Sequence, residues 1–322
     1  MKVTHSIISE DWIADYVIER YDLQKGTICK YLCQGLNDSY LLTAGTKKYI
    51  FRLYRRLWRT IEKISAEVDL LVQLEKHSAP IAGVVHDQHG KSIQSLECPE
   101  GKRYGILMHC AANTERESHC IITGNAYQYG KAMAKLHNAM KRCESPEGVT
   151  ALNVDHLIWE PLTLAEQAFP DNNDELRHLR HFALQLAEQI NSVGNHTSRG
   201  LIHGDLTGGN ACIDEDGNFV FFDFDCCGYG WIAYDLAVFL WSATLNGKDK
   251  ILWPELMSGY RSEADLKDQD LALVPLLVAA RNCWIMGYSI SQMGVKGTLN
   301  YRAQYFMRDV EFFKKWENQL PT

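Results

Sequence analysis

The 322-residue chain lacks the sequence features of a secreted or membrane-bound protein. Its longest apolar run, Leu271–Ala280, has ten residues and includes Pro275, whereas a membrane-spanning helix needs about 20. No apolar signal segment follows Met1, and the ten cysteines include no Cys-x-x-Cys pair. We therefore expect a cytoplasmic protein with reduced thiols, no membrane partner and no structural metal site.

The chain also lacks an excess of positive charge. Its net charge of −7 and isoelectric point near 5.9 argue against a nucleic-acid partner, which needs Lys and Arg to neutralise phosphates. The acidity is uneven, because residues 1–110 hold 15 Lys/Arg and 13 Asp/Glu whereas residues 111–322 hold 18 and 27. With 46% hydrophobic residues, the chain has enough apolar material for a folded core, which excludes a disordered protein.

The hydrophobic pattern changes character near residues 108–113. Before this point it predicts a helix capped by Ser9, a longer helix over 60–77, and strands over 27–33, 39–44, 48–54, 81–86 and 103–109. After it, the pattern predicts a hairpin of 211–213 with 219–222 and helices over 126–143, 174–196, 233–245, 251–260, 271–288 and 300–316. We predict an α+β protein with two domains, 1–110 and 111–322.

The segment around His203-Gly204-Asp205 carries the clearest chemical pattern. Apolar strand residues lead into this turn, Asn210 follows five residues after Asp205, and a hairpin then returns Asp223 at the end of a strand. One carboxylate can accept a proton from a hydroxyl, while the other carboxylate and the amide oxygen are hard ligands suited to Mg²⁺. This division of roles is what phosphoryl transfer requires.

Two other interpretations use the same residues. Asp and Asn in glycine-rich turns often only bind their own backbone, although the joint spacing favours catalysis. His-x-Asp is also part of the iron site of non-haem oxygenases, which needs a second histidine downstream. No histidine follows His203, so we interpret His203 as a residue that braces the catalytic turn.

Three motifs resemble the signature of the aminoglycoside phosphotransferase/choline kinase family, which includes homoserine kinase type II. They are His203-Gly204-Asp205-Leu206-x₃-Asn210, Phe222-Asp223-Phe224-Asp225 and Tyr234-Asp235-Leu236-Ala237. The resemblance implies a two-lobed protein-kinase-like fold, in which the first lobe has a small mixed β-sheet with one long helix and the second lobe is mainly helical. It also implies the cofactors ATP and Mg²⁺.

The resemblance assigns roles within these motifs. Asp205 is expected to be the catalytic base, Asn210 and Asp223 the Mg²⁺ ligands, and Asp225 a second aspartate near the metal and the acceptor. Asp235 is expected to tie the following helix to the catalytic loop, although a simple cap at the start of that helix would explain it equally well.

The expected nucleotide site lies in the first domain. Gly35, Asn37 and Ser39 stand where the family's phosphate-covering loop belongs, although an ordinary hairpin is the alternative. Arg52 stands where the family usually has lysine, although some branches, choline kinases among them, also carry arginine there. Its guanidinium is expected to contact the α/β-phosphates and to pair with a carboxylate, and Glu67 is the matching helix glutamate.

Two further segments flank this site. The backbone of residues 108–110, from Met108 to Cys110, would form the hinge that meets adenine. Arg55, Arg56 and Arg59 are expected to form a solvated basic turn, with contact to phosphate or an acidic partner as the alternative.

The acceptor would bind in the helical domain, where we expect Trp231, Arg281 and Trp284 to contribute; core packing is the alternative for each. The acidity of residues 111–322 favours a cationic acceptor. The expected function is therefore ATP-dependent phosphorylation of a hydroxyl on a small, amine-bearing molecule such as an amino alcohol, hydroxyamino acid or amino sugar. A Ser/Thr protein kinase and a non-catalytic nucleotide-binding regulator remain as alternatives.

Overall fold

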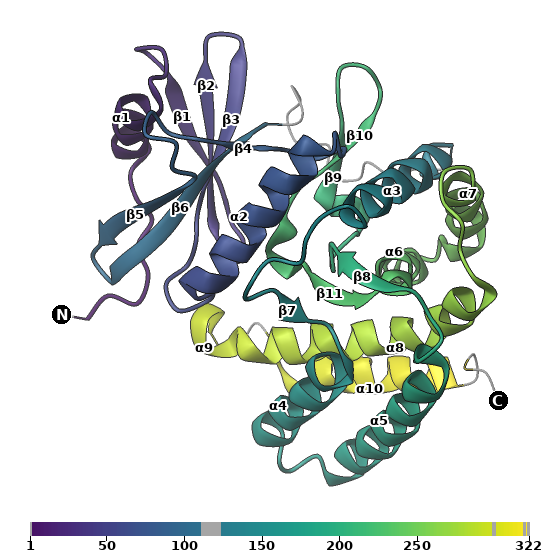
Figure 1. Ribbon diagram of the computed structural model, residues 1–322. Helices are drawn as coiled ribbons and strands as arrows, with labels where there is room; N and C mark the ends of the chain where they lie inside the picture. Colours follow the sequence, from purple (N-terminus) through teal and green to yellow (C-terminus); the bar gives the residue numbers. More distant parts are fainter. Residues whose placement is uncertain (1, 111–123, 298–300, 318–319, 321–322) are drawn as a thin grey trace. The chain divides into compact units, whose positions relative to one another are not determined.

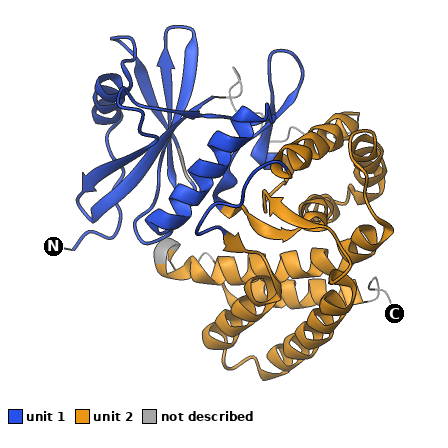
Figure 2. Cartoon of the chain, in the orientation of Figure 1, with its two compact units in different colours: residues 1–120, 142–149, 209–225 blue, residues 121–141, 150–208, 226–322 orange. Residues whose placement is uncertain are grey.

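The computed structural model describes residues 2–110, 124–297, 301–317 and 320, and it divides into two compact units (Figure 2). Unit 1 consists of residues 1–120, 142–149 and 209–225, and unit 2 of residues 121–141, 150–208 and 226–322. Unit 1 is built around an antiparallel sheet and unit 2 is mainly helical, so the predicted α+β class is confirmed.

The sheet of unit 1 has six strands (Figure 1): β1 (Ile28–Gln34), β2 (Asp38–Ala44), β3 (Lys47–Leu53), β4 (Val84–Val85), β5 (Ile93–Cys98) and β6 (Gly101–His109). Their order is β1-β2-β3-β6-β4, with β5 paired to β6. Every described pair between these strands is antiparallel, so the expectation of a mixed sheet was wrong. The reason is that short turns join β1 to β2, β2 to β3 and β5 to β6, and only antiparallel neighbours can be joined in this way.

Two helices accompany this sheet, and both begin where a side-chain cap predicts. Ser9 Oγ accepts a hydrogen bond from Trp12 N at the start of α1 (Glu10–Tyr21), and Thr60 caps α2 (Ile61–Lys76) in the same way. The buried face of α1 packs with Tyr40, Phe51 and Leu107 of the sheet in one hydrophobic cluster. The sheet therefore has a covered face that fixes its register.

A separate hairpin completes unit 1. It consists of β9 (Ala211–Ile213) and β10 (Phe219–Phe221), as the Asp216-Gly217 turn predicts. Phe221 N donates to Pro80 O at 2.8 Å and Phe221 O accepts from Ala82 N at 2.9 Å, so β10 is fastened to the segment that leads into β4. This pairing fixes the position of the residues that follow β10.

Unit 2 contains helices around a three-stranded sheet of order β7-β11-β8, formed by β7 (Thr150–Ala151), β8 (Arg199–Ile202) and β11 (Gly228–Trp231). The helices are α3 (Ala126–Met140), α4 (Glu160–Ala168), α5 (Asn173–Gly194), α6 (Ile232–Leu245), α7 (Asp249–Arg261), α8 (Asp268–Ser291), α9 (Met293–Lys296) and α10 (Ala303–Glu317). The predicted helices are confirmed, whereas α4, which follows a π-helical turn over Asp155–Trp159, was not predicted.

Helix α8 is long and apolar enough to cross a membrane if only length and composition are considered. However, 67% of its most apolar window is buried, and α8 packs against α4, α5, α6 and α10 within unit 2. This burial is what the core helix of a folded unit requires.

Candidate active site

The loop of unit 2 that carries Asp205 begins where β8 ends. Gly204 adopts a φ of 80°, and a Cβ atom at this position would lie 2.2 Å from the carbonyl oxygen of Cys226. Only glycine accepts both the left-handed backbone and this close approach. The backbone turns at Gly204 and brings the following residue, Asp205, to a partly exposed position.

Asp235 of α6 ties this loop to the helix. Its Oδ1 accepts from Gly204 N at 2.8 Å, and its Oδ2 accepts from His203 N at 2.9 Å and from His137 Nε2 at 3.0 Å. Burial alone would raise the pKa of Asp235, but the hydrogen bond and charge of His137, together with His203, hold that pKa below its ordinary value. The predicted tie between helix and loop is therefore confirmed.

His137 was missed by sequence analysis. It lies on the buried face of α3, where its Nδ1 lies 2.8 Å from the hydroxyl oxygen of Tyr260 while Nε2 binds Asp235. The available signal was a histidine at helical spacing among apolar residues, which by itself indicates only a core position.

His203 is fully buried, and its Nδ1 accepts a hydrogen bond from Asp205 N at 3.2 Å. This contact joins the His203 ring to the backbone of the turn, as a bracing role requires. A buried ring engaged with the backbone orients Asp205 and has no need to react itself.

Arg281 of α8 contacts Asp205 directly. Its Nη2 forms an ion pair with Asp205 Oδ1, and its Nη1 donates to Gly204 O at 3.2 Å. Burial disfavours the charged guanidinium, but Asp205 offsets this, so the pKa of Arg281 lies above its ordinary value. Arg281 is only 2% exposed, which makes it a support for Asp205 rather than a cation offered to solvent.

The aromatic residues predicted for the acceptor site lie in two places. The guanidinium carbon of Arg281 lies 4.8 Å from the ring centroid of Trp284 and 5.3 Å from that of Trp241. Nε1 of Trp284 donates to His156 Nε2 at 3.0 Å. Trp231 instead contacts the guanidinium carbon of Arg199 at 4.5 Å and is buried. The structure therefore brings Arg281 and Trp284 together, and it gives Trp231 a packing environment of its own.

The carboxylates expected to hold a metal lie in unit 1. Phe222 N donates to Asn210 O at 3.1 Å, which keeps Asn210 beside the segment that leads to Asp223. Asp223 has a φ of 70°, so the chain turns sharply after β10. Burial and the neighbouring charge of Asp223 raise the pKa of Asp225 well above its ordinary value.

This donor set fits Mg²⁺. A divalent cation would remove the unfavourable proximity of the Asp223 and Asp225 charges, and carboxylate and amide oxygens are its preferred protein ligands. No group of three or more His, Cys, Asp or Glu suited to a metal occurs in the described part of the chain. Proteins usually bind Mg²⁺ through a few oxygen ligands of their own, and phosphate and water supply the remaining ligands.

Arg52 on β3 lies beside these residues. Its Nη1 pairs with Glu67 Oε1 at 3.0 Å and its Nη2 with Asp223 Oδ1 at 2.9 Å, while Arg59 Nη1 pairs with Glu67 Oε2 at 2.6 Å. Although burial disfavours the charged form, the carboxylates raise the pKa of Arg52 above its ordinary value. The expected pairing of Arg52 with Glu67 is confirmed, and both Nη atoms of Arg52 are engaged by carboxylates.

The turn between β1 and β2 is joined to the same group. Asn37 Nδ2 donates to Asp225 Oδ2 at 3.2 Å, and Asn37 Oδ1 accepts from Arg55 N at 3.3 Å. Gly35 N donates to Asn37 O at 3.1 Å, and Ser39 pairs with Arg52 in the β2–β3 register. The Asn37 side chain is thus buried and engaged by Asp225 and by the backbone of Arg55.

The expected solvated basic turn after β3 was wrong for two of its three arginines. Arg55 is buried and the side chain of Arg59 is engaged by Glu67, whereas Arg56 is exposed. Closely spaced arginines indicate a charged surface segment, but tertiary contacts decide which of these side chains are exposed to solvent.

The expected hinge is part of β6 and the residue after it. Met108 is buried and pairs with Ile50 and Val84, and Cys110 N donates to Lys48 O at 3.1 Å. Residues 111–123, which continue the hinge, lie outside the described part of the structure. Contact of this segment with adenine stays a prediction.

Solved structures show the class of protein to which this architecture belongs. A microcompartment-associated aminopropanol kinase superposes with a TM-score of 0.76 at 20% identity, with 95% of each chain covered. An amicoumacin kinase solved with AMP-PNP and Ca²⁺ superposes with a TM-score of 0.73 at 20% identity, with 98% of this chain and 95% of that chain covered. The chain therefore has the fold of small-molecule kinases.

The model of the phosphotransferase enzyme family matches residues 34–256, so the chain belongs to this family. An uncharacterized protein of Deinococcus radiodurans is 30% identical over 319 residues, which cover 98% of this chain and 92% of the relative. A homoserine kinase of a Caulobacter species is 25% identical over 285 residues, which cover 84% and 82%. The resemblance drawn from the three motifs is confirmed.

Proposed function

We propose that this phosphotransferase transfers the γ-phosphoryl group of ATP to a hydroxyl of a small, amine-bearing molecule. The observation that supports this most strongly is the construction of the catalytic loop. Gly204, His203, Asp235 and Arg281 each fix a different side of the turn that presents Asp205. Such a rigid support is expected for a group that must be positioned to accept a proton.

In this reaction, Asp205 accepts the proton of the acceptor hydroxyl as that oxygen attacks the γ-phosphorus. The bond between the γ-phosphorus and the bridging oxygen breaks, and ADP leaves with the electron pair. Asn210 and Asp223 would hold Mg²⁺, which neutralises charge on the phosphates. Arg52 holds Asp223 and Glu67 in place, and the turn from Gly35 to Ser39 would cover the phosphates with backbone N–H groups.

An Asp205→Ala variant tests the role of this residue. We expect turnover of ATP to fall by about 10²-fold or more, since general-base catalysis contributes about 10²–10⁴. The affinity for ATP should stay within about twofold of the wild type, because the proposed nucleotide contacts are those of other residues. Asp216→Ala, which changes an exposed carboxylate in the β9–β10 turn, is the control and should keep full activity. Turnover retained by Asp205→Ala would contradict the mechanism.

The acceptor can be identified by measuring ADP release with panels of amino alcohols, hydroxyamino acids and amino sugars. The proposal of an amine-bearing acceptor rests on the acidity of residues 111–322 and on the names of the similar kinases, which act on aminopropanol and homoserine. Release of ADP with one panel defines the acceptor class. Activity with added proteins alone would instead indicate a Ser/Thr protein kinase.

A further inference from the structure

Arg55, just after β3, has a guanidinium group in which two buried nitrogen atoms lack a hydrogen-bond partner. The residue is 7% exposed, and its Nε and Nη1 atoms are buried without a hydrogen-bond partner. The polar contacts of Arg55 within the described residues are made by its backbone, whose N donates to Asn37 Oδ1 and whose O accepts from Trp58 N. Within the described residues, Arg55 makes neither an ion pair nor a cation–π contact.

A buried charge without a partner is costly, and an unsatisfied donor costs about 1–3 kcal/mol by itself. The neighbouring arginines show the contrast. Arg52 is also buried and the side chain of Arg59 is largely covered, and both pair with the carboxylate of Glu67. Arg55 therefore has the charge and the donors to bind an anion, and no carboxylate of the described chain supplies one.

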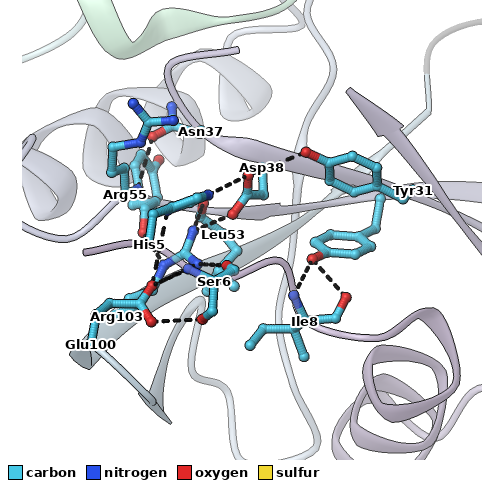
Figure 3. A network of polar contacts seen from close by, with 12 residues as sticks. His5, Ser6, Ile8, Tyr31, Asn37, Asp38, Leu53, Arg55, Glu100 and Arg103 are labelled. Atoms are coloured by element: carbon cyan, nitrogen blue, oxygen red, sulfur yellow. Dashed lines mark hydrogen bonds and ion pairs between the residues drawn. The ribbon is translucent and has the colours of Figure 1, made fainter. Parts of the chain in front are cut away.

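The position of Arg55 indicates which anion it would bind. Its backbone holds Asn37, which belongs to the turn proposed to cover the nucleotide phosphates and which also binds Asp225. Figure 3 shows the Arg55 and Asn37 side chains beside each other, away from the contacts that join Asp38 to Arg103. Arg52, the arginine expected to contact phosphate, already uses both of its Nη atoms on Glu67 and Asp223.

We infer that Arg55 binds a phosphate group of the nucleotide through its guanidinium fork. This inference rests on the proposed use of ATP. A guanidinium donates two parallel hydrogen bonds to phosphate oxygens, which an ammonium group cannot reproduce in the same geometry.

The test compares Arg55→Met with Arg56→Met, a control that changes the adjacent, exposed arginine. Dissociation constants for ATP, ADP and adenosine are measured by calorimetry, and melting temperatures are measured without ligand. For Arg55→Met we expect ATP and ADP to bind about 10- to 100-fold more weakly, with adenosine affinity unchanged. The melting temperature without ligand should stay the same or rise, because a buried, unpartnered charge is removed. Arg56→Met should match the wild type in all of these measurements.

Three results would overturn the inference: unchanged ATP affinity in Arg55→Met, an equal loss of adenosine affinity, or a lower melting temperature without ligand. The last two would show that Arg55 serves only the fold. If the wild type itself binds no ATP, the proposed function fails, and tripolyphosphate then decides the inference separately. Stabilisation of the wild type by tripolyphosphate that is lost in Arg55→Met supports an anion site, and no stabilisation of the wild type overturns it.

Discussion

The buried charge of Arg103 is held by several partners at once. Arg103 on β6 is fully buried, and it donates to Asp38 Oδ2 at 2.6 Å, to Glu100 Oε1 at 3.3 Å and to Ser6 O at 2.9 Å (Figure 3). Ser6 Oγ in turn donates to Glu100 Oε2 at 2.6 Å. The network fixes the segment before α1 and also Asp38, which directly follows Asn37 in the proposed phosphate-covering turn.

Asp235 gives a prediction about pH at this scale. Its native pKa is below the ordinary 3.8, so the carboxylate stabilises the protein at neutral pH, and this stabilisation is lost as the pH falls from about 4 through the native pKa. We expect Asp235→Asn to lower the free energy of unfolding at pH 7 by about 3 kcal/mol or more, because two backbone N–H groups and His137 lose a charged acceptor.

The measurement is urea denaturation of both proteins between pH 7 and pH 2.5. The difference between wild type and Asp235→Asn should shrink as the pH falls below about 4. A difference that stays constant over this range would show that ionisation of Asp235 is not the source of its contribution. Asp216→Asn, at an exposed turn, should track the wild type throughout.

At the scale of elements, α3 and α7 approach each other through glycines. A Cβ atom on Gly130 would lie 2.1 Å from Leu256 O, and one on Gly259 would lie 1.9 Å from Tyr127 O. Both obstacles are backbone atoms, which cannot move without shifting a helix. The two glycines therefore set how closely the helices pack.

Gly130→Ala should lower the free energy of unfolding by about 2 kcal/mol or more, although alanine favours a helix, because the added methyl group forces α3 and α7 apart. The matched control is Gly294→Ala in α9, where a Cβ atom meets nothing within 4 Å. This control should be neutral or slightly stabilising. Chemical denaturation of both variants measures the difference, and equal stabilities would contradict the packing argument.

Local signals predicted much of this architecture, whereas tertiary contacts decided the rest. The start of α1 and the β9–β10 hairpin follow from short sequence signals, as does the Asp205 turn. Strand β5 was missed because one of its buried residues, Gln94, is polar and obscures the alternation. The burial of Arg55 was missed because the three neighbouring arginines, Arg52, Arg56 and Arg59, have the same local sequence character, and only the folded chain distinguishes them.

The whole molecule has a charge distribution with a kinetic consequence. Residues 111–322 hold 27 acidic and 18 basic residues, so a cationic acceptor would be attracted at long range. Salt screens this attraction, because the Debye length falls from about 10 Å at 0.1 M to about 3 Å at 1 M.

We therefore expect kcat/KM for an amine-bearing acceptor to fall several-fold between about 0.05 and 0.5 M KCl. A neutral hydroxyl compound of similar size, used as the control acceptor, should show little change, and kcat should change little for either. Steady-state kinetics at several salt concentrations measures this. An equal loss of kcat/KM for both acceptors would indicate an effect of salt on the enzyme and not on the encounter.

The order of segments along the chain also bears on biosynthesis. The chain passes between the two units five times, and unit 1 takes its last segment, residues 209–225, from far beyond its sheet. The segment at Pro80–Ala82 is made early, but its hydrogen-bonding partner, Phe221, leaves the ribosome about 140 residues later. At about 5–20 residues per second, the nascent sheet waits for roughly 7–28 seconds without this strand. Until then the growing chain contains the turn proposed to cover the phosphates but lacks Asp223. Nucleotide binding that depends on this carboxylate therefore becomes possible only after most of the protein has been synthesised.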